Sequence, residues 1–334
     1  MNRFARTTSL AALALLALRC GPSATGGSGT QEPLADPAAG DAGTAAPADA
    51  GAAAVTDVAA ASPAHRVEPI ARPSGPDLTE AQQALVRGLN FMGASRWGEA
   101  AAAFEQATTL DPNYADAFLG LGQARGKLGD LVGARTALER AVELRPEYGP
   151  NHAELGEVLF DLEEWDAAER ALRDAARLDS TDGLSLGRLG VLYRRSNRFD
   201  EAVAAYRQAI ERLPDDPGLY NNLGVALRKL RRYDEAVEAH QHALTLEPEN
   251  ALFHFNLGVA FRGQGQEQLA IAEYRSAVRQ DPTLADAYHD LGLLLANQGE
   301  DDAAIEALEL YLELAPPDDG GLDEVRQRLS ELRD

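Results

Sequence analysis

Carboxylates are abundant in this chain of 334 residues, but no isolated apolar setting singles one out as an acid–base group, and no other residues have a catalytic spacing. The six histidines include no i, i+4 pair, which would place two metal ligands on one helix face, and the single cysteine excludes a multi-cysteine metal site. We find no Walker loop, no H-E-x-x-H motif and no nucleophile elbow. We therefore predict a protein that is not an enzyme and that uses no cofactor and no metal.

A strict repeat organises most of the chain. A glycine recurs at every 34th position, and an alanine lies 12 positions after each one; the glycines are Gly88, Gly122, Gly156, Gly190, Gly224, Gly258 and Gly292. With Ala81 as position 1, seven repeats each contain two helical runs separated by a polar break near positions 14 to 16. Proline at position 32 ends the second run in six repeats. The third repeat has Ser180 there, so we expect a less sharply defined helix end.

This pattern closely resembles the tetratricopeptide repeat family, whose signature is W-x2-L-G-x2-Y, then A-x3-F, then a further Ala and Pro. Six of the seven glycines follow a leucine, and Ala202 with Tyr206 is one instance of the A-x3-aromatic step. His240 takes this aromatic position in the fifth repeat, and Tyr311 replaces the later small residue in the last. The resemblance implies an all-α superhelical solenoid, with about seven helix-turn-helix repeats over residues 78–318.

The last residues, 319–334, predict one more helix. Leu322, Val325, Leu329 and Leu332 fall at helical spacing, and charged residues occupy the opposite side. A repeat array needs a terminal element with a polar outer face, so we expect a capping helix. We also expect Tyr311 to pack against a different neighbour from its counterparts in the other repeats.

Two histidines fall on core positions of successive repeats. His240 and His254 both take aromatic-type positions, so we expect them to touch as a hydrogen-bonded core pair. A metal site or a pH-sensing site is the alternative.

Residues 1–20 are organised like a bacterial export signal. Arg3 and Arg6 precede an apolar run over residues 10–18, which is too short to span a bilayer in the mature protein. Cys20 follows at once and resembles the lipidation site of a bacterial lipoprotein, although Arg19 departs from the small residue usual there. We expect an exported lipoprotein that is anchored in a membrane and faces the periplasm. Secretion and a cytoplasmic location are the alternatives.

Residues 21–77 consist mainly of Ala, Gly, Pro, Ser, Thr and Asp, without apolar periodicity. Such a segment cannot bury enough apolar surface to offset the entropy lost on ordering. We therefore expect a disordered linker between the anchor and the repeats.

The charge of the chain bears on its partners. The net charge is −22, which opposes binding to nucleic acid and to anionic lipid surfaces. We expect another protein as the partner, no nucleic acid, and membrane contact only through the lipid anchor.

The resemblance also implies where a partner binds, because the first helix of each repeat lines the concave groove in this family. Polar and charged candidates that project into the groove are Arg194, Arg228, Arg262, Arg195, Lys229, Asn222 and Asn256. Asparagine can hydrogen-bond a peptide backbone and arginine can bind carboxylates, so these rows suit an extended acidic segment. For the arginines, a solvated or helix-capping role is the alternative. Phe160 and Phe255 also point toward the groove, and burial under a neighbouring repeat is the alternative for them.

We therefore expect a non-enzymatic protein–protein interaction scaffold of the bacterial cell envelope. The family resemblance suggests a role in assembling envelope machinery. A soluble cytosolic adaptor, or an accessory subunit that presents substrates to a separate enzyme, is the alternative.

Overall fold

The computed structural model describes residues 70–334, which form fifteen α-helices and no strand. The odd-numbered helices up to α13 open the repeats: α1 (Glu80–Gly93), α3 (Ala115–Lys127), α5 (Gly149–Asp161), α7 (Gly183–Arg195), α9 (Pro217–Lys229), α11 (Ala251–Gly263) and α13 (Ala285–Asn297). The even-numbered helices close them: α2 (Trp97–Leu110), α4 (Leu131–Leu144), α6 (Trp165–Leu178), α8 (Phe199–Arg212), α10 (Tyr233–Leu246), α12 (Glu267–Gln280) and α14 (Asp301–Leu314). Helix α15 (Leu322–Arg333) follows the last repeat. The expected signal, Cys20 and most of the expected linker lie outside the described residues.

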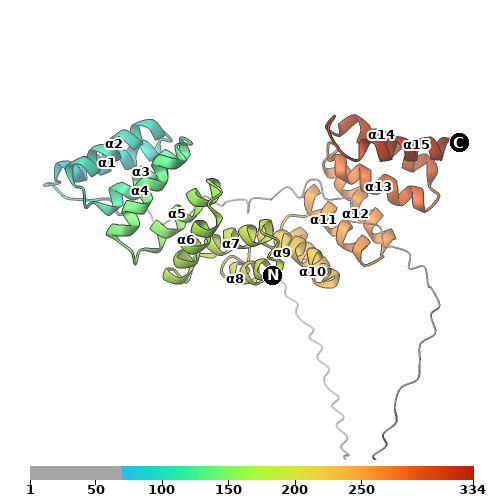
Figure 1. The fold of residues 1–334 in the computed structure, drawn as a ribbon, viewed down its shortest axis with the longest axis horizontal. Coiled ribbons are helices and arrows are strands. Elements are labelled where there is room, and N and C mark those ends of the chain that lie inside the picture. Colours follow the sequence, from blue (N-terminus) through green and yellow to red (C-terminus); the bar gives the residue numbers. More distant parts are fainter. Residues whose placement is uncertain (1–69) are drawn as a thin grey trace, which may run out of the picture. The chain divides into compact units, whose positions relative to one another are not determined.

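Each helix packs against the next one in the sequence, so the helices follow one another along the array (Figure 1). The odd-numbered helices from α1 to α11 also contact one another across successive repeats. They therefore form a common face, which we call the odd-helix face. Within residues 70–334, no helix combines the length and apolarity needed to cross a membrane.

The crossing of the two helices in each repeat depends on the recurring glycine. A Cβ added to Gly258 would lie 2.6 Å from Cε1 of the Tyr274 ring and 3.2 Å from the Ala270 carbonyl oxygen. The other six glycines face the residue 16 positions later in the same way: Phe104, Leu138, Leu172, Tyr206, His240 and Leu308. The alanine that recurs in register with each glycine is fully buried. Small residues thus allow close helix packing, as the repeat predicts.

The turn between the two helices of each repeat contains one residue with a left-handed backbone conformation, that is, with a positive φ. Glycine supplies it in three repeats, for example Gly129 with φ of 79°, where a positive φ is unstrained. The other four repeats use non-glycine residues in the same conformation: Ser95, Glu163, Asn197 and Arg231. The turn geometry is therefore kept even where the sequence does not favour it.

The prediction for the third repeat was wrong. Helix α6 ends at Leu178, the same repeat position as in its counterparts, although Ser180 replaces proline. The Oδ1 atom of Asp179 accepts hydrogen bonds from the backbone N (2.8 Å) and the hydroxyl (2.7 Å) of Thr181. A side-chain turn thus fixes the helix end without proline.

The helix predicted after the last repeat is present as α15. Leu322, Val325 and Leu329 of α15 form a separate buried cluster with Leu308 and Tyr311 of α14. The Tyr311 hydroxyl donates to Asp319 at 2.6 Å. The different neighbour expected for Tyr311 is therefore the capping helix and the loop before it.

The array begins before α1. Ile70 is buried against the hydrophobic core, and the Arg72 guanidinium donates to the Asn90 side chain of α1 at 2.9 Å. The chain is thus held at the first repeat from residue 70, inside the segment expected to be linker.

The prediction that His240 and His254 form a hydrogen-bonded pair is wrong. His254 lies 2.7 Å from a carboxylate oxygen of Glu273 and 3.0 Å from the Pro248 carbonyl. His240 is fully buried against Gly224, and neither ring nitrogen has a hydrogen-bond partner among the described residues. Burial, and to a lesser degree the charge of Arg228, lower the pKa of His240 to about 3.

We predict that Gly258→Ala destabilises the protein by about 1–3 kcal/mol, because the added methyl group overpacks the contact with Tyr274. Gly98→Ala in α2 is the control, since a Cβ at Gly98 has open space within 4 Å. That change should stabilise the helix by up to about 1 kcal/mol. Urea unfolding of the full chain measures both; equal effects would contradict the proposed packing.

We predict that His240→Phe stabilises the protein, since Phe104 fills the same repeat position against Gly88. Removing buried nitrogens without partners is worth about 1–3 kcal/mol at pH 8. The unfolded chain binds a proton at His240 below pH ~6.5, whereas the folded protein resists it down to about pH 3.

The gain should therefore grow by about 2 kcal/mol between pH 8 and pH 5. Urea unfolding at both pH values tests it, with the exposed His242→Asn as control. A gain that does not change with pH would refute this account of His240.

A candidate protein-interaction face

Charge is segregated between the two sets of helices in the middle of the array. Helices α7, α9 and α11 contain no acidic residue, although the whole chain carries a net charge of −22. They carry six cations: Arg188, Arg194, Arg195, Arg228, Lys229 and Arg262. The even-numbered helices α8 and α10 of the same repeats each carry three acids. The odd-helix face is therefore basic in repeats four to six, and we call these three helices the basic face.

Acidic helices flank the basic face on both sides. Helix α5 carries Glu154, Glu157 and Asp161, and helix α13 carries Asp286 and Asp290. Burial, together with the nearby carboxylates of Asp290 and Asp319, raises the pKa of Asp286 to about 6. A segment that crosses successive odd-numbered helices would thus meet negative, positive and again negative surface.

The boundary with α5 is built around Phe160. Its ring packs edge-on against Trp165, with centroids 5.3 Å apart, and the guanidinium groups of Arg188 and Arg195 lie 4.9 and 5.2 Å from its centroid. Arg188 is also paired with Glu157. Phe160 is 5% exposed. The structure therefore shows Phe160 as a packing residue that supports two arginines, and its contact with a partner stays a prediction.

The remaining cations of α7 and α9 differ in exposure. Arg195 is exposed, Arg194 and Lys229 are half-buried, and Arg228 is buried near His240. Burial raises the pKa of Tyr206 to about 12, and the neighbouring charge of Arg194 acts in the opposite direction. Arg195 and Lys229 are thus the predicted site residues best placed to meet a partner.

Arg262 of α11 lies at the end of the basic face that adjoins α13. Its guanidinium lies 3.1 Å from the buried carboxylate of Asp290, which also accepts from the Tyr274 hydroxyl at 3.1 Å. Burial tends to raise the pKa of Asp290, but His289, Arg262 and Tyr274 together hold it below its usual value. Asp290 therefore stays ionised and partly neutralises Arg262.

The predicted asparagine row is buried. Asn222 and Asn256 are 2% and 7% exposed, and the Asn256 amide donates to Asn221 of the preceding odd-numbered helix at 2.9 Å. Phe255 is also buried, with its ring 5.7 Å from that of Tyr274. These contacts give Asn256 and Phe255 packing roles between helices, and a role in binding a partner stays a prediction for all three predicted residues.

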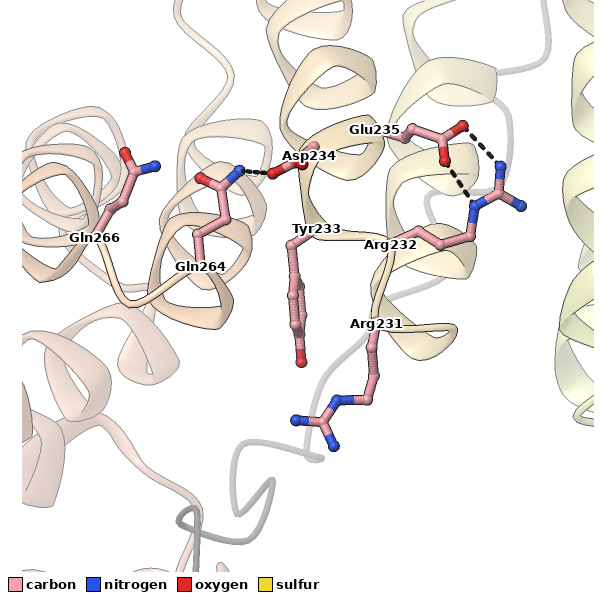
Figure 2. Close-up of a pocket in the computed structure, with 7 residues that line it drawn as sticks. All are labelled: Arg231, Arg232, Tyr233, Asp234, Glu235, Gln264 and Gln266. Carbon is pink, nitrogen blue, oxygen red and sulfur yellow. Dashed lines mark hydrogen bonds and ion pairs between the residues drawn. The ribbon is translucent and has the colours of Figure 1, made fainter. Parts of the chain in front are cut away.

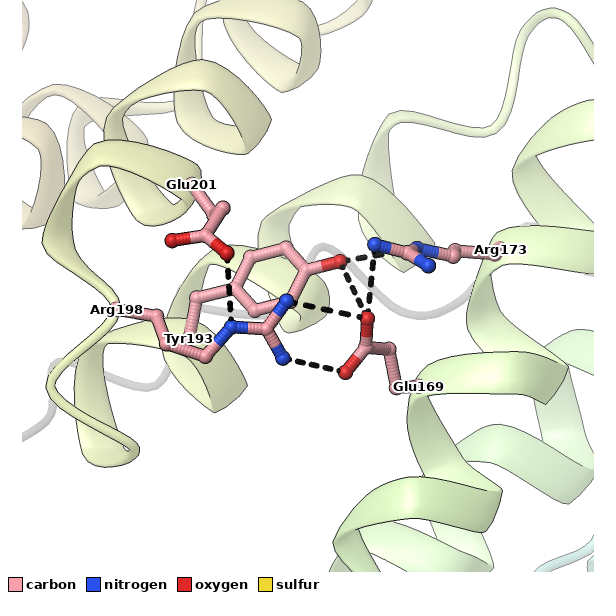
Figure 3. Close-up of polar contacts among 5 residues, drawn as sticks. All are labelled: Glu169, Arg173, Tyr193, Arg198 and Glu201. Carbon is pink, nitrogen blue, oxygen red and sulfur yellow. Dashed lines mark hydrogen bonds and ion pairs between the residues drawn. The ribbon is translucent and has the colours of Figure 1, made fainter.

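Not every cation in these repeats belongs to the basic face. Glu169 accepts from Arg198 at 2.7 Å and from the Tyr193 hydroxyl at 3.1 Å, and it pairs with Arg173 at 2.8 Å (Figure 3). Arg198 also donates to Glu201 at 2.9 Å. Burial acts to raise the pKa of Glu169, but these partners hold it below its usual value. This network ties repeat three to repeat four, so its cations are neutralised internally.

A pocket of about 450 Å³ lies at the turns of repeats five and six. Figure 2 shows the residues that line it, which are Arg231, Arg232, Tyr233, Asp234, Glu235, Gln264 and Gln266. Gln264 donates to Asp234 at 2.7 Å, and Arg232 pairs with Glu235. Four of the seven lining residues are therefore paired with one another, and the Gln264 Oε1 atom is buried without a hydrogen-bond partner among the described residues. Residues 70–334 contain no group of three His, Cys, Asp or Glu side chains placed to hold a metal ion.

Two features escaped the sequence analysis. Arg188 holds the same repeat position as Asn222, so the repeat register was a signal that could have found it. The string Gly-Leu-Ser-Leu-Gly at residues 183–187 has the G-x-S-x-G pattern. It lies within the first turns of α7, and Ser185 is buried, with its backbone N bonded to Asp182. A nucleophile elbow needs an exposed serine on a strand-to-helix turn, so this string does not form one.

Comparisons with known proteins agree with this architecture. Models described as tetratricopeptide repeat match residues 85–149, 221–285 and 273–306, and a model described as TPR repeat matches residues 190–230. Together they cover more than half of the chain. No curated protein matches the sequence significantly.

Several solved structures share the fold at low identity. The C-terminal part of a TPR repeat-containing protein from Cytophaga hutchinsonii has a TM-score of 0.61 at 16% identity, over 71% of this chain and 97% of that one. YrrB, described as a TPR protein with an unusual peptide-binding site, has a TM-score of 0.50 at 22% identity, over 58% of this chain and 99% of that one.

The match to the Cut9–Hcn1 hetero-tetramer of the APC/C has a TM-score of 0.52 at 18% identity and covers 76% of this chain. This chain spans only 56% of that one. At such identities the likeness shows the fold alone. The fold suggests a scaffold for protein–protein interaction, and from its repeats the chain belongs to the tetratricopeptide repeat family.

Proposed function

We propose that this protein is a non-enzymatic interaction scaffold that binds an extended acidic segment of a partner protein on its basic face. One observation carries the proposal: six cations and no acid lie on three successive odd-numbered helices of a strongly acidic chain. Such local positive charge attracts a complementary acidic partner and repels basic ones. The peptide-binding site named for YrrB, which shares the fold, supports a peptide-like ligand.

The geometry defines the size of the segment. Packed helices lie about 8–10 Å apart, so α7 and α11 are separated by about 20 Å. An extended chain of about six to eight residues covers this distance. Acidic residues are needed in the centre of the segment, since α5 and α13 are themselves acidic.

The first test reverses charge at the two most suitable cations. Arg195→Glu with Lys229→Glu should weaken binding of a labelled Asp/Ala peptide of about ten residues by about tenfold or more, because two attractive charges become repulsive. Fluorescence anisotropy at low salt measures this. Arg262 is left unchanged because its reversal would place two carboxylates together at Asp290.

The matched control is Arg170→Glu with Arg279→Glu on the even-numbered helices α6 and α12. Both residues are exposed, and the change in net charge is the same. The control should alter peptide affinity less than about twofold, and higher salt should weaken the wild-type complex. Equal losses in both variants would show that the basic face is not the binding site.

We also propose that the scaffold acts in the bacterial envelope, anchored by lipid on Cys20, and that it assists the assembly of envelope machinery. The proposal is supported by the basic residues Arg3 and Arg6, by the apolar run over residues 10–18 and by Cys20 soon after that run. The long segment between Cys20 and Ile70 would separate the anchor from the repeats.

Labelling with a fatty-acid probe tests the anchor. Wild-type protein should take up the probe and remain with membranes, and Cys20→Ser should remove the label. Globomycin, which blocks lipoprotein processing, should cause accumulation of the longer precursor. Unlabelled wild-type protein in the cytosol would instead support the soluble adaptor.

A further inference from the structure

The pocket at the turns of repeats five and six has both paired and unpaired groups in its lining. Four of the seven lining residues are bonded to one another. The side chains of the other three have no hydrogen-bond or ion-pair partner among residues 70–334, and they belong to Arg231, Tyr233 and Gln266. None of these three residues lies on the basic face. The pocket thus offers a guanidinium, a phenol hydroxyl and a carboxamide to a ligand.

The turn of repeat five does not itself need an arginine. Arg231 has a φ of 60°, and glycine takes the same repeat position as Gly129, Gly265 and Gly299 in three other repeats. A residue other than glycine is strained at a positive φ. The Arg231 side chain is exposed and lines the pocket. Glycine would therefore serve the turn at least as well, and what the arginine adds is a positive charge in the pocket.

Tyr233 supplies a second donor beside Arg231. A Cβ added to Gly263 would overlap the Tyr233 ring, so this close contact fixes the ring against the end of α11. Figure 2 shows the ring between Gln264 and Arg231, with its hydroxyl pointing toward the Arg231 guanidinium. Both groups can donate hydrogen bonds, so together they can hold one anionic group.

The other charges around the pocket decide which anion fits. Glu235 pairs with Arg232 at 2.7 Å and with Arg207 at 2.6 Å, and Asp234 already accepts a hydrogen bond from a glutamine side chain. Arg231 is thus the lining cation without an acidic partner among the described residues. One such charge matches a carboxylate, whereas the nearby acids would repel the dianion of a phosphate group.

The rest of the lining suits a peptide main chain. Gln264 and Gln266 lie on the other side of the Tyr233 ring from Arg231 (Figure 2). A carboxamide both donates and accepts, as the two groups of a peptide unit require. The Oε1 atom of Gln264 has no hydrogen-bond partner among the described residues, so acceptor capacity is unused here. The volume of about 450 Å³ lies within the range of small-molecule sites.

We propose that this pocket binds the C-terminal end of a partner protein. Arg231 and the Tyr233 hydroxyl hold the terminal carboxylate, and the preceding peptide units run past the Tyr233 ring toward Gln266. A chain end carries one negative charge at the end of a neutral main chain, and the pocket has its unmatched cation at one end and carboxamides at the other. The site shares no residue with the basic face, so it goes beyond the proposed acid-binding function and does not depend on it.

Nuclear magnetic resonance of the full chain with isotope-labelled tyrosine tests the site. The probe is N-acetyl-trialanine with a free carboxylate, since three extended residues span about 10 Å. The Tyr233 ring signal, identified by its loss in Tyr233→Phe, should shift with a Kd of about 0.1–10 mM. The C-terminal amide of the same peptide lacks the charge and should bind about tenfold or more weakly.

Arg231→Gly removes the guanidinium and leaves the turn unstrained, so the midpoint of urea unfolding should stay close to the wild-type value. This variant should bind the free-acid probe about tenfold or more weakly than wild type. The matched control is Arg170→Gln in α6, which removes one exposed arginine that also has no partner among the described residues. Its affinity should stay within about twofold of wild type.

Each contrary result would overturn the proposal. Equal binding of the free acid and the amide, or no shift of Tyr233 at mM probe concentrations, would show that the carboxylate is not recognised. Unchanged affinity of Arg231→Gly would place binding elsewhere, and an equal loss in Arg170→Gln would reduce the effect to net charge. A third probe, the C-terminal amide of N-acetyl-Ala-Glu-Ala, carries its carboxylate on a side chain. If it binds as tightly as the free acid, the pocket takes an acidic side chain and not a chain end.

Discussion

The close crossing of two helices within each repeat is the constraint on which the rest of the structure depends. A glycine backbone on the first helix lies against a buried ring or leucine on the second, and the space between them cannot accept a methyl group. This contact recurs seven times at the same register, so every repeat presents its helices in the same way. Because each repeat has the same geometry, equivalent positions form rows along the array.

The rows explain how an acidic protein acquires a basic face. In repeats four to six, cations concentrate on the odd-numbered helices, and the even-numbered helices α8 and α10 carry most of the acids. Small and apolar residues fill most of the packing positions, so charge varies mainly at the positions between them. The result is a charge pattern that runs along one face of the array.

Local exceptions to the repeat are compensated by specific interactions. Asp179 and Thr181 form, without a proline, the same turn that Asp281 and Thr283 form around Pro282. Tyr311 joins the last repeat to its capping helix. His240 is different, because it fills the ring position but leaves its two nitrogens without partners among the described residues. Burying these nitrogens without hydrogen bonds costs free energy, and the close packing of the surrounding core offsets that cost.

The repeat period, the helix pairs, the capping helix and the cations of the groove rows were all predictable from the sequence, because spacing alone sets which residues share a helix face. The tertiary structure decided which of these residues are accessible and which are paired. Asn222, Asn256 and Phe160 proved buried, Arg262 was found against Asp290, and Arg188 was found against Glu157. These outcomes depend on contacts between helices of successive repeats, far apart in the sequence. Such contacts are fixed by three-dimensional packing and not by the pattern within any one helix.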